Sequence, residues 1–313
     1  MIESEGLRKE YGGFVAVDDV NFSVEPGEIF GIVGPNGAGK TTTLKMLAGL
    51  VEPTEGSARV AGYDSEDAEM RRYLGYLPEE SPLYEDMTAR SYLRFFADLY
   101  DVPRDTADER IEETLDRLDL EHRERRIGDM SKGMKRKVAI TRSLVNDPDV
   151  LIYDEPASGL DPLTTNYIIE FTQELKDEGK TVVFSAHNLY HVESVCDRVV
   201  ILNEGRVVAR GTLEEIREEH GGTEYHVYTT EEVPGYETTR KNGRLRTVVD
   251  DMDEVEKVRS SVEETGGEVV DIRTQDPSLE EIFLDVAETT SEREPERAAA
   301  SNPDEESRTT TWR

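Results

Sequence analysis

This 313-residue chain has few of the features that mark secreted or membrane-embedded proteins. Cys196 is its only cysteine, so an intramolecular disulfide is impossible. No apolar run approaches the roughly 18 residues that a membrane-spanning helix needs. The N-terminal sequence MIESEGLRKEYGG lacks the basic and apolar regions of a signal peptide. We therefore expect neither a disulfide-linked scaffold nor an integral membrane protein.

Basic residues are scarce as well, with 37 lysines and arginines against 69 aspartates and glutamates and a formal net charge of −32. Only 10 of these basic residues are lysines. No dense basic patch stands out, which disfavours a nucleic-acid partner. Because the acidic residues are dispersed, the composition favours a halophilic protein, adapted to high salt in which ions screen self-repulsion. An ordinary acidic protein with a solvated surface is the alternative.

Hydrophobic patterning predicts an α/β domain over residues 1–220. Residues 14–33 contain two short apolar strands around a turn, and residues 150–153 and 181–184 are typical of buried strands. Helical patterns separate them, and the one over residues 81–120 predicts a helical subdomain at about 80–130. Strands that alternate with helices indicate an α/β fold. Residues 198–202 and 206–209 flank Asn203-Glu204-Gly205 and predict a hairpin.

A change of pattern near His220-Gly221-Gly222 predicts the end of this domain. The following pattern predicts a small C-terminal α+β domain over residues 223–287. Its expected elements are strands at 225–229 and 245–249, a helix at 254–264, a strand at 269–273 and a short helix at 279–286. Residues 288–313 are polar and charged and contain proline, which predicts a disordered acidic tail.

The strongest motif is a glycine-rich loop between a predicted strand and a predicted helix. It fits the pattern G-x-x-x-x-G-K-[ST] and consists of Gly34, Pro35, Asn36, Gly37, Ala38, Gly39, Lys40 and Thr41. Backbone N–H groups of such a loop point at phosphate oxygens, and the start of the helix adds a positive dipole end. Lys40 is placed for the β- and γ-phosphates, Thr41 for Mg²⁺, and Thr42 lies near the α-phosphate. The motif predicts a site for ATP and Mg²⁺.

A second motif, Val150-Leu151-Ile152-Tyr153-Asp154-Glu155, ends an apolar strand in two carboxylates. We expect Asp154 beside the magnesium ion and Glu155 next to it, where its carboxylate can polarise the attacking water. A buried strand that runs into an acidic turn would give the same pattern by itself. Together with the phosphate loop, the motif predicts nucleotide hydrolysis.

Three further motifs stand in a fixed order around these two. Residues 130–137 (MSKGMKRK) precede an apolar helical pattern, residues 157–161 (ASGLD) follow Glu155, and residues 185–187 (SAH) end the strand at 181–184. Over roughly residues 2–215 the sequence resembles the nucleotide-binding subunits of ABC transporters. The resemblance implies the ABC ATPase type of P-loop NTPase fold and ATP hydrolysis coupled to transport.

The resemblance also assigns roles by position. Tyr11 matches the aromatic residue that stacks on adenine. Ser131 and Gly133 match the signature loop, and Asp161 matches the loop at the dimer seam. His187 matches the switch histidine that contacts the γ-phosphate and belongs, with Lys40 and Glu155, to the expected catalytic residues.

Two motifs depart from the usual family pattern. Met130-Ser131-Lys132-Gly133-Met134 stands where Leu-Ser-Gly-Gly-Gln is usual, but the serine hydroxyl and the second glycine are kept. Glu79 replaces a usual glutamine, and its carboxylate is an expected ligand of magnesium or water. Both departures resemble ATPases of ABC-2 type exporters, including sodium and drug efflux systems, as does the segment at residues 276–284.

The resemblance implies two partners. The signature loop lies far from its own phosphate loop in this family, so a complete site needs a second ATPase subunit, expected to be the same chain in a head-to-tail dimer. The other partner is a separate hydrophobic permease, which would hold the chain at the cytoplasmic face of the cell membrane. The helical region after Glu79, including Leu83, Tyr84 and Met87, is the expected docking surface for that permease.

Two alternatives belong to other functional classes. One is a soluble ABC-type ATPase of DNA repair or translation that is not coupled to transport. Chromosome-type members insert a long coiled coil between the halves of the site, whereas only about 110 residues separate Lys40 from Asp154 here. Translation-type members usually carry two phosphate loops, whereas this sequence has one. The other is a non-catalytic regulatory ATP binder, which the intact Lys40, Asp154, Glu155 and His187 disfavour.

Overall fold

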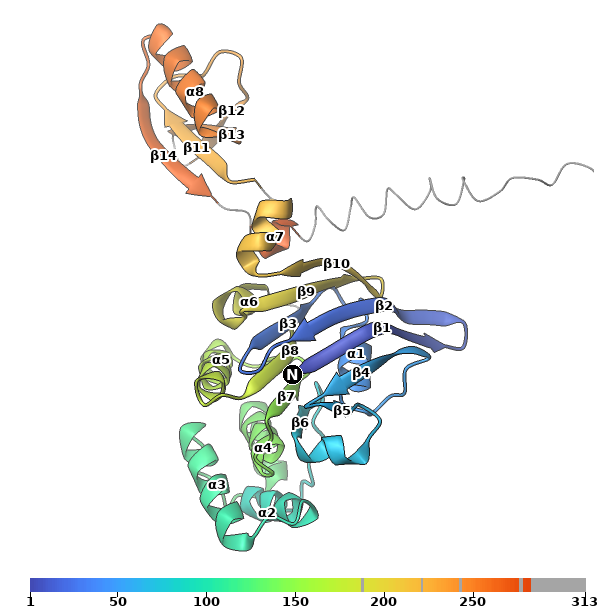
Figure 1. Ribbon diagram of the computed structural model, residues 1–313. Helices are drawn as coiled ribbons and strands as arrows, with labels where there is room; N and C mark the ends of the chain where they lie inside the picture. The colour runs from blue at the N-terminus through green and yellow to red at the C-terminus, as the bar shows by residue number, and fades with distance from the viewer. Residues whose placement is uncertain (187–188, 221, 242–243, 276–277, 283–313) are drawn as a thin grey trace, which may run out of the picture. The chain divides into compact units, whose positions relative to one another are not determined.

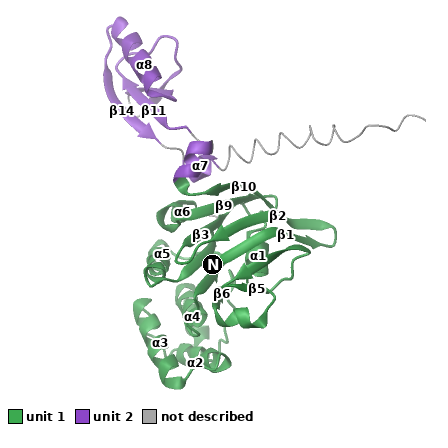
Figure 2. Ribbon diagram, in the orientation of Figure 1, with its two compact units in different colours: residues 1–213 green, residues 214–313 purple. Residues whose placement is uncertain are grey.

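The computed structural model describes residues 1–186, 189–220, 222–241, 244–275 and 278–282. The chain divides into two compact units, residues 1–213 and 214–313 (Figure 2). The division falls at the start of α7 (Leu213–His220), so this helix goes with the second unit, whereas the sequence pattern placed the boundary behind it. Across the described residues, no helix is both long enough and apolar enough to span a bilayer.

A six-stranded sheet in the order β10-β9-β3-β8-β7-β6 organises the larger unit (Figure 1). Its strands are β3 (Ile29–Val33), β6 (Leu74–Leu77), β7 (Val150–Tyr153), β8 (Thr181–Ala186), β9 (Arg198–Asn203) and β10 (Arg206–Gly211). All neighbours are parallel except β10, which forms the predicted hairpin with β9. Every residue of β3, β7 and β8 is buried, which explains why these strands are continuous apolar runs. The predicted α/β fold is confirmed.

A second, antiparallel sheet in the order β2-β1-β4-β5 shares its core with the first sheet. Its strands are β1 (Ile2–Tyr11), β2 (Phe14–Val24), β4 (Glu55–Val60) and β5 (Tyr63–Asp64). The helix α1 (Lys40–Leu47) contributes Leu44 and Leu47 to this core, where they join Leu7 of β1 and Ile32 of β3. β1 and β4 were not predicted, because their apolar residues alternate with polar ones and form no continuous run.

Three helices, α2 (Ala89–Leu99), α3 (Arg104–Arg117) and α4 (Lys132–Leu144), form a helical subdomain with its own apolar core. Residues 81–120 are mainly helical, as expected, but the first helix begins only at Ala89, since residues 80–88 are not helical. Pro82 disfavours helix in the residue before it, and Thr88 caps α2, its Oγ1 accepting the Ser91 N–H at 3.2 Å.

The three residues expected on a docking helix therefore lie in a non-helical segment before α2. Leu83 and Met87 pack against the core of the helical subdomain. Only Tyr84 is exposed, and its ring makes edge contacts with Tyr92 and Phe95.

Two further helices, α5 (Pro162–Asp177) and α6 (Leu189–Val195), pack against the six-stranded sheet at β8, and α6 also contacts β3.

The second unit contains an antiparallel sheet in the order β12-β13-β11-β14 and the helix α8 (Met252–Glu264). Its strands are β11 (Glu224–Thr229), β12 (Thr238–Lys241), β13 (Arg244–Val249) and β14 (Val269–Gln275). Val255, Val258 and Val262 of α8 pack against Val227 and Val249 of the sheet. The predicted strands and long helix are confirmed, and β12 is additional. Residues 279–282 are helical, whereas the rest of the expected short helix and the tail at 288–313 lie outside the described residues.

The carboxyl ends of parallel strands meet at one edge of the six-stranded sheet, and this arrangement creates the site. The glycine-rich loop follows β3, Glu79 lies two residues beyond the end of β6, and Asp154 and Glu155 directly follow β7. Ser185 lies near the end of β8. Motifs that are distant in the sequence are thus brought together by strand order.

Candidate active site

The glycine-rich loop depends on residues without a side chain at two close approaches. A Cβ on Gly34 would lie 2.2 Å from the Leu202 carbonyl oxygen, and one on Gly39 would lie 2.6 Å from the Ala16 carbonyl oxygen. Both glycines also have positive φ, at 150° and 100°. Lys40 is 6% exposed, and its Nζ donates to the carbonyls of Gly34 at 2.8 Å and Pro35 at 3.1 Å. The ammonium group is therefore held at the loop, within reach of an anion bound there.

Asp154 lies against Thr41, as the two motifs predict. Thr41 Oγ1 donates to Asp154 Oδ1 at 3.2 Å, and Ser185 Oγ donates to the same carboxylate oxygen at 2.7 Å. Asp154 is 1% exposed. A hydroxyl and a carboxylate this close are hard oxygen ligands that fit Mg²⁺, which usually takes one or two protein groups together with phosphates and water. No cluster of three or more His, Cys, Asp or Glu ligands occurs within the described ranges.

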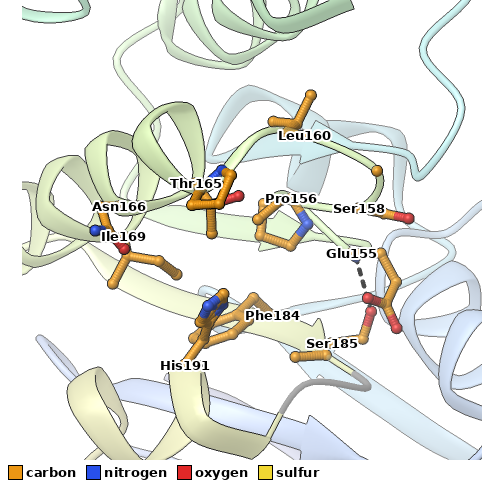
Figure 3. Close-up of a pocket in the computed structure, with 14 residues that line it drawn as sticks. Glu155, Pro156, Ser158, Leu160, Thr165, Asn166, Ile169, Phe184, Ser185 and His191 are labelled. Atoms are coloured by element: carbon orange, nitrogen blue, oxygen red, sulfur yellow. Dashed lines mark hydrogen bonds between the residues drawn. The ribbon is translucent and has the colours of Figure 1, made fainter.

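Glu155 is buried beside the lysine of the phosphate loop. It is 8% exposed, and its Oε1 lies 3.8 Å from Lys40 Nζ. Its φ is 47°, in the left-handed region that non-glycine residues seldom occupy. The Glu155 N–H donates to Ser185 Oγ at 3.0 Å, a contact drawn in Figure 3. The main chain of the expected base is therefore held in an unfavourable conformation by its surroundings.

A pocket of about 460 Å³ surrounds the phosphate loop and gathers most of the predicted residues. Its lining consists of Phe14, Ala16, the loop from Pro35 to Gly39, Lys40, Thr41, Thr42, Glu79, Glu155 and Ser158. The structure thus brings Glu79 from the end of β6 to the same pocket as Glu155. The placement agrees with the expected role of Glu79 near phosphate or metal.

The residue expected to stack on adenine does not line this pocket. Tyr11 is 46% exposed, and Lys9 Nζ lies 5.2 Å from the centre of its ring. Phe14, paired with Tyr11 across the Gly12-Gly13 turn, is 65% exposed and does line the pocket. Phe14 was not singled out from the sequence, although an exposed aromatic residue beside a tight turn was an available signal.

The signature residues lie beside the start of α5 and not in the pocket of their own chain. Ser131 caps α4, its side chain accepting the Met134 N–H at 3.2 Å, and a Cβ on Gly133 would lie 3.2 Å from Thr164 Cγ2. Asp161 caps α5 and accepts hydrogen bonds from the N–H and the hydroxyl of Thr164. These bonds lower the pKa of Asp161 below its ordinary value. His187 lies outside the described residues.

A second cavity of about 310 Å³ lies on the α5 side of Glu155 (Figure 3). Phe184 and His191 line it, as do Thr165 and Asn166 of α5. Glu155 and Ser158 border both this cavity and the phosphate-loop pocket. Movement of the segment after Glu155 would therefore alter both spaces.

Comparison with known proteins gives a consistent result. The family model described as "ABC transporter" matches residues 17–158, and one described as "ATP-binding protein DrrA1-3-like, C-terminal domain" matches residues 211–287. The ABC transporter ATP-binding protein NatA of Bacillus subtilis is 44% identical over 207 residues, which cover 65% of this chain and 84% of that protein. The linearmycin resistance ATP-binding protein LnrL of the same organism is 37% identical, with 71% and 72% covered.

A solved structure supports the same assignment. It is a dimeric ATP-binding cassette in a post-hydrolysis state, bound to ADP and Pi. The TM-score is 0.62 at 27% identity, and the match covers 68% of this chain and 99% of that one.

Proposed function

The chain belongs to the family of ABC transporter ATP-binding subunits, and we propose that it hydrolyses ATP to power export through a separate membrane permease. The observation that carries this proposal is the convergence of Lys40, Glu155 and the Thr41–Asp154 pair at the glycine-rich loop. Lys40, Thr41 and Glu155 line one pocket, and Asp154 contacts it through Thr41, so phosphate binding, a metal site and a base lie together.

Each group has a distinct task in the proposed reaction. The backbone N–H groups of the loop bind the phosphates, and Lys40 exchanges its carbonyl partners for phosphate oxygens. Thr41 and Asp154 would hold Mg²⁺, with Glu79 as a further proposed ligand through a side-chain oxygen that glutamine at this position would also offer. Bound Mg²⁺ supplies positive charge that offsets the charge of the phosphates. The Glu155 carboxylate accepts the proton of the attacking water.

We further propose that a second copy of the chain completes the site. Ser131 and Gly133 do not line the phosphate-loop pocket of their own chain, so they are available to a nucleotide bound by the other copy. Asp161 would lie at the seam of this head-to-tail dimer, and His187 would contact the γ-phosphate. Tyr11, with Phe14 beside it, would contact the adenine. The dimeric structure of a relative with ADP and Pi supports this arrangement.

The exporter assignment rests on the relatives. LnrL is named for resistance to linearmycin, and the model that matches residues 211–287 is named for DrrA-like ATP-binding proteins. We propose an ABC-2 type exporter, with this chain on the cytoplasmic side of the membrane and attached through its permease. We also propose domain limits at residues 220, 223 and 287. Adaptation to high salt is a further proposal, based on the composition.

Hydrolysis by the purified chain tests the enzymatic part. Wild type should hydrolyse MgATP, and Lys40→Ala should weaken nucleotide binding, because the loop loses the cation that contacts the phosphates. Lys45→Ala is the matched control, since Lys45 lies in the last turn of the same helix and does not line the pocket. Equal nucleotide affinity in the two variants would contradict the assignment of Lys40.

Co-purification tests the transport part. A permease encoded beside the gene for this chain should bind the chain and change its rate of hydrolysis. Active hydrolysis without any such partner would favour the soluble, uncoupled ATPase.

A further inference from the structure

A buried guanidinium group connects the loop of Glu79 with the loop of Glu155. Arg136 lies on α4 and is 7% exposed. Its Nε donates to the Pro156 carbonyl at 2.7 Å. Nη2 donates to the carbonyls of Asp154 at 3.1 Å and Glu155 at 2.7 Å. Nη1 donates to the carbonyls of Pro78 at 2.7 Å and Glu79 at 3.0 Å, and to Ser81 Oγ at 3.3 Å.

Only an arginine can make this set of contacts. The guanidinium presents five N–H donors in a rigid plane, so one side can serve residues 78–81 and the other residues 154–156. Burial lowers the pKa of Arg136 to about 10, and the group therefore stays protonated at neutral pH. A neutral or shorter donor would leave several buried carbonyls without a partner, which is costly.

These contacts hold the backbone of two residues, Glu79 and Glu155, whose side chains line the phosphate-loop pocket. Glu155 has a φ of 47°, and its peptide groups are held from two sides, by Ser185 at the N–H and by Arg136 at the carbonyl. The same guanidinium holds the carbonyl of Glu79. Arg136 itself does not line the phosphate-loop pocket, so it acts on these residues through their backbone.

We propose that Arg136 is a positioning residue for ATP hydrolysis, because its guanidinium ties the loop of Glu79 to the loop of Glu155 and so fixes the Glu155 carboxylate for the attacking water. The inference rests on the proposed hydrolysis at this site. The guanidinium also connects the two loops, so a displacement of the Glu79 backbone would displace the Glu155 backbone. A misplacement of a reacting group by about 1 Å can cost about 100-fold in rate.

Arg136→Gln and a matched control test the proposal. Arg142 lies on the same helix, and its contacts are in the helical subdomain, where Nη1 donates to Tyr92 Oη at 3.0 Å and the guanidinium lies 5.4 Å from the centre of the Phe96 ring. Arg136→Gln should lower kcat about 10- to 100-fold and leave the KM for ATP within about threefold, because the phosphate loop is untouched. Arg142→Gln should lower the unfolding temperature and leave kcat near the wild-type value.

A double-mutant cycle separates positioning from general destabilisation. In a Glu155→Gln background, Arg136→Gln should cause little further loss of turnover, because the group that it positions is already gone. Arg136→Lys keeps the charge but reaches fewer carbonyls, so it should give an intermediate kcat, and it carries the same cycle if Arg136→Gln does not fold. Wild-type kcat in Arg136→Lys, or an equal fractional loss with and without Glu155, would overturn the proposal. Wild-type hydrolysis, measured alongside, tests the proposed function separately.

Discussion

Replacing Ser185 by alanine should damage both the stability and the chemistry of the site. Ser185 is fully buried, its Oγ donates to Asp154 Oδ1 at 2.7 Å, and it accepts the Glu155 N–H at 3.0 Å. The substitution removes a hydrogen bond to a carboxylate, worth about 1.5–3 kcal/mol, and leaves a buried N–H without this acceptor, at about 1–3 kcal/mol. Since coupled losses do not add fully, we expect the free energy of unfolding to fall by about 2–4 kcal/mol.

A second buried serine provides the control. Ser143 is 4% exposed, and its Oγ contacts the Ile140 carbonyl at 2.7 Å and Tyr153 Oη at 3.2 Å. These partners are neutral, so Ser143→Ala should cost about 1–2 kcal/mol without moving Glu155. The assays are urea unfolding and hydrolysis at saturating MgATP. Ser185→Ala should lose about tenfold or more in kcat, because the Glu155 backbone is released. An equal kcat in the two variants would refute the reasoning.

Three further predictions concern charge. Glu79→Gln should leave basal hydrolysis unchanged or raise it, because the amide oxygen can still face the metal while negative charge leaves the phosphate-loop pocket. A large loss together with a higher Mg²⁺ requirement would show that the metal needs the carboxylate itself. Dimerisation and ATPase activity should rise with KCl into the molar range, because salt screens the repulsion between two chains that each carry a charge of −32. The Debye length falls from about 10 Å at 0.1 M to about 3 Å at 1 M. An optimum at or below about 0.1 M would contradict adaptation to high salt. Asp147 accepts a hydrogen bond from Lys180 Nζ at 2.6 Å, and this contact lowers the pKa of Asp147 below its ordinary value of 3.8. The ionised carboxylate therefore stabilises the fold above pH 3.8. This stabilisation is lost as the pH falls through the lowered pKa. Asp147→Asn should therefore cost about 0.5 kcal/mol at pH 7 and nothing in strong acid, and a pH-independent loss in thermal unfolding would count against the ion pair.

Several groups of the proposed site can be located from the sequence because they follow continuous apolar strands. Residues 29–33 and 150–153 are buried on both faces of the sheet, so each is a continuous apolar run. Such a run can be recognised as a strand without information on the neighbouring strands. The loop after the first strand and the carboxylates after the second then followed from the motifs. Glu79 was expected near them only through the family resemblance, and in the structure the pairing of β6 with β7 brings it there.

The features that the sequence left open depend on tertiary contacts. Arg136 stands in a run of basic residues, and nothing local distinguishes its buried side chain from the half-buried Lys135 and Lys137 beside it. β1 was missed because its half-buried alternation is weak without its two partner strands. The segment around Tyr84 was included in the helical region because of the helical spacing that follows it at residues 91–100 and 111–120. Pro82 and the cap at Thr88 delay the helix to residue 89.

Glu155→Gln is the most direct test of the central claim, that this chain is an ATPase with Glu155 as its base. The substitution keeps the size of the side chain but removes its ability to accept a proton. ATP binding should persist, and turnover should fall by about 10²–10⁴-fold, the usual size of a general-base contribution. Light scattering should show an ATP-dependent dimer that accumulates, because the nucleotide between the subunits is no longer consumed. Hydrolysis near the wild-type rate would contradict the account.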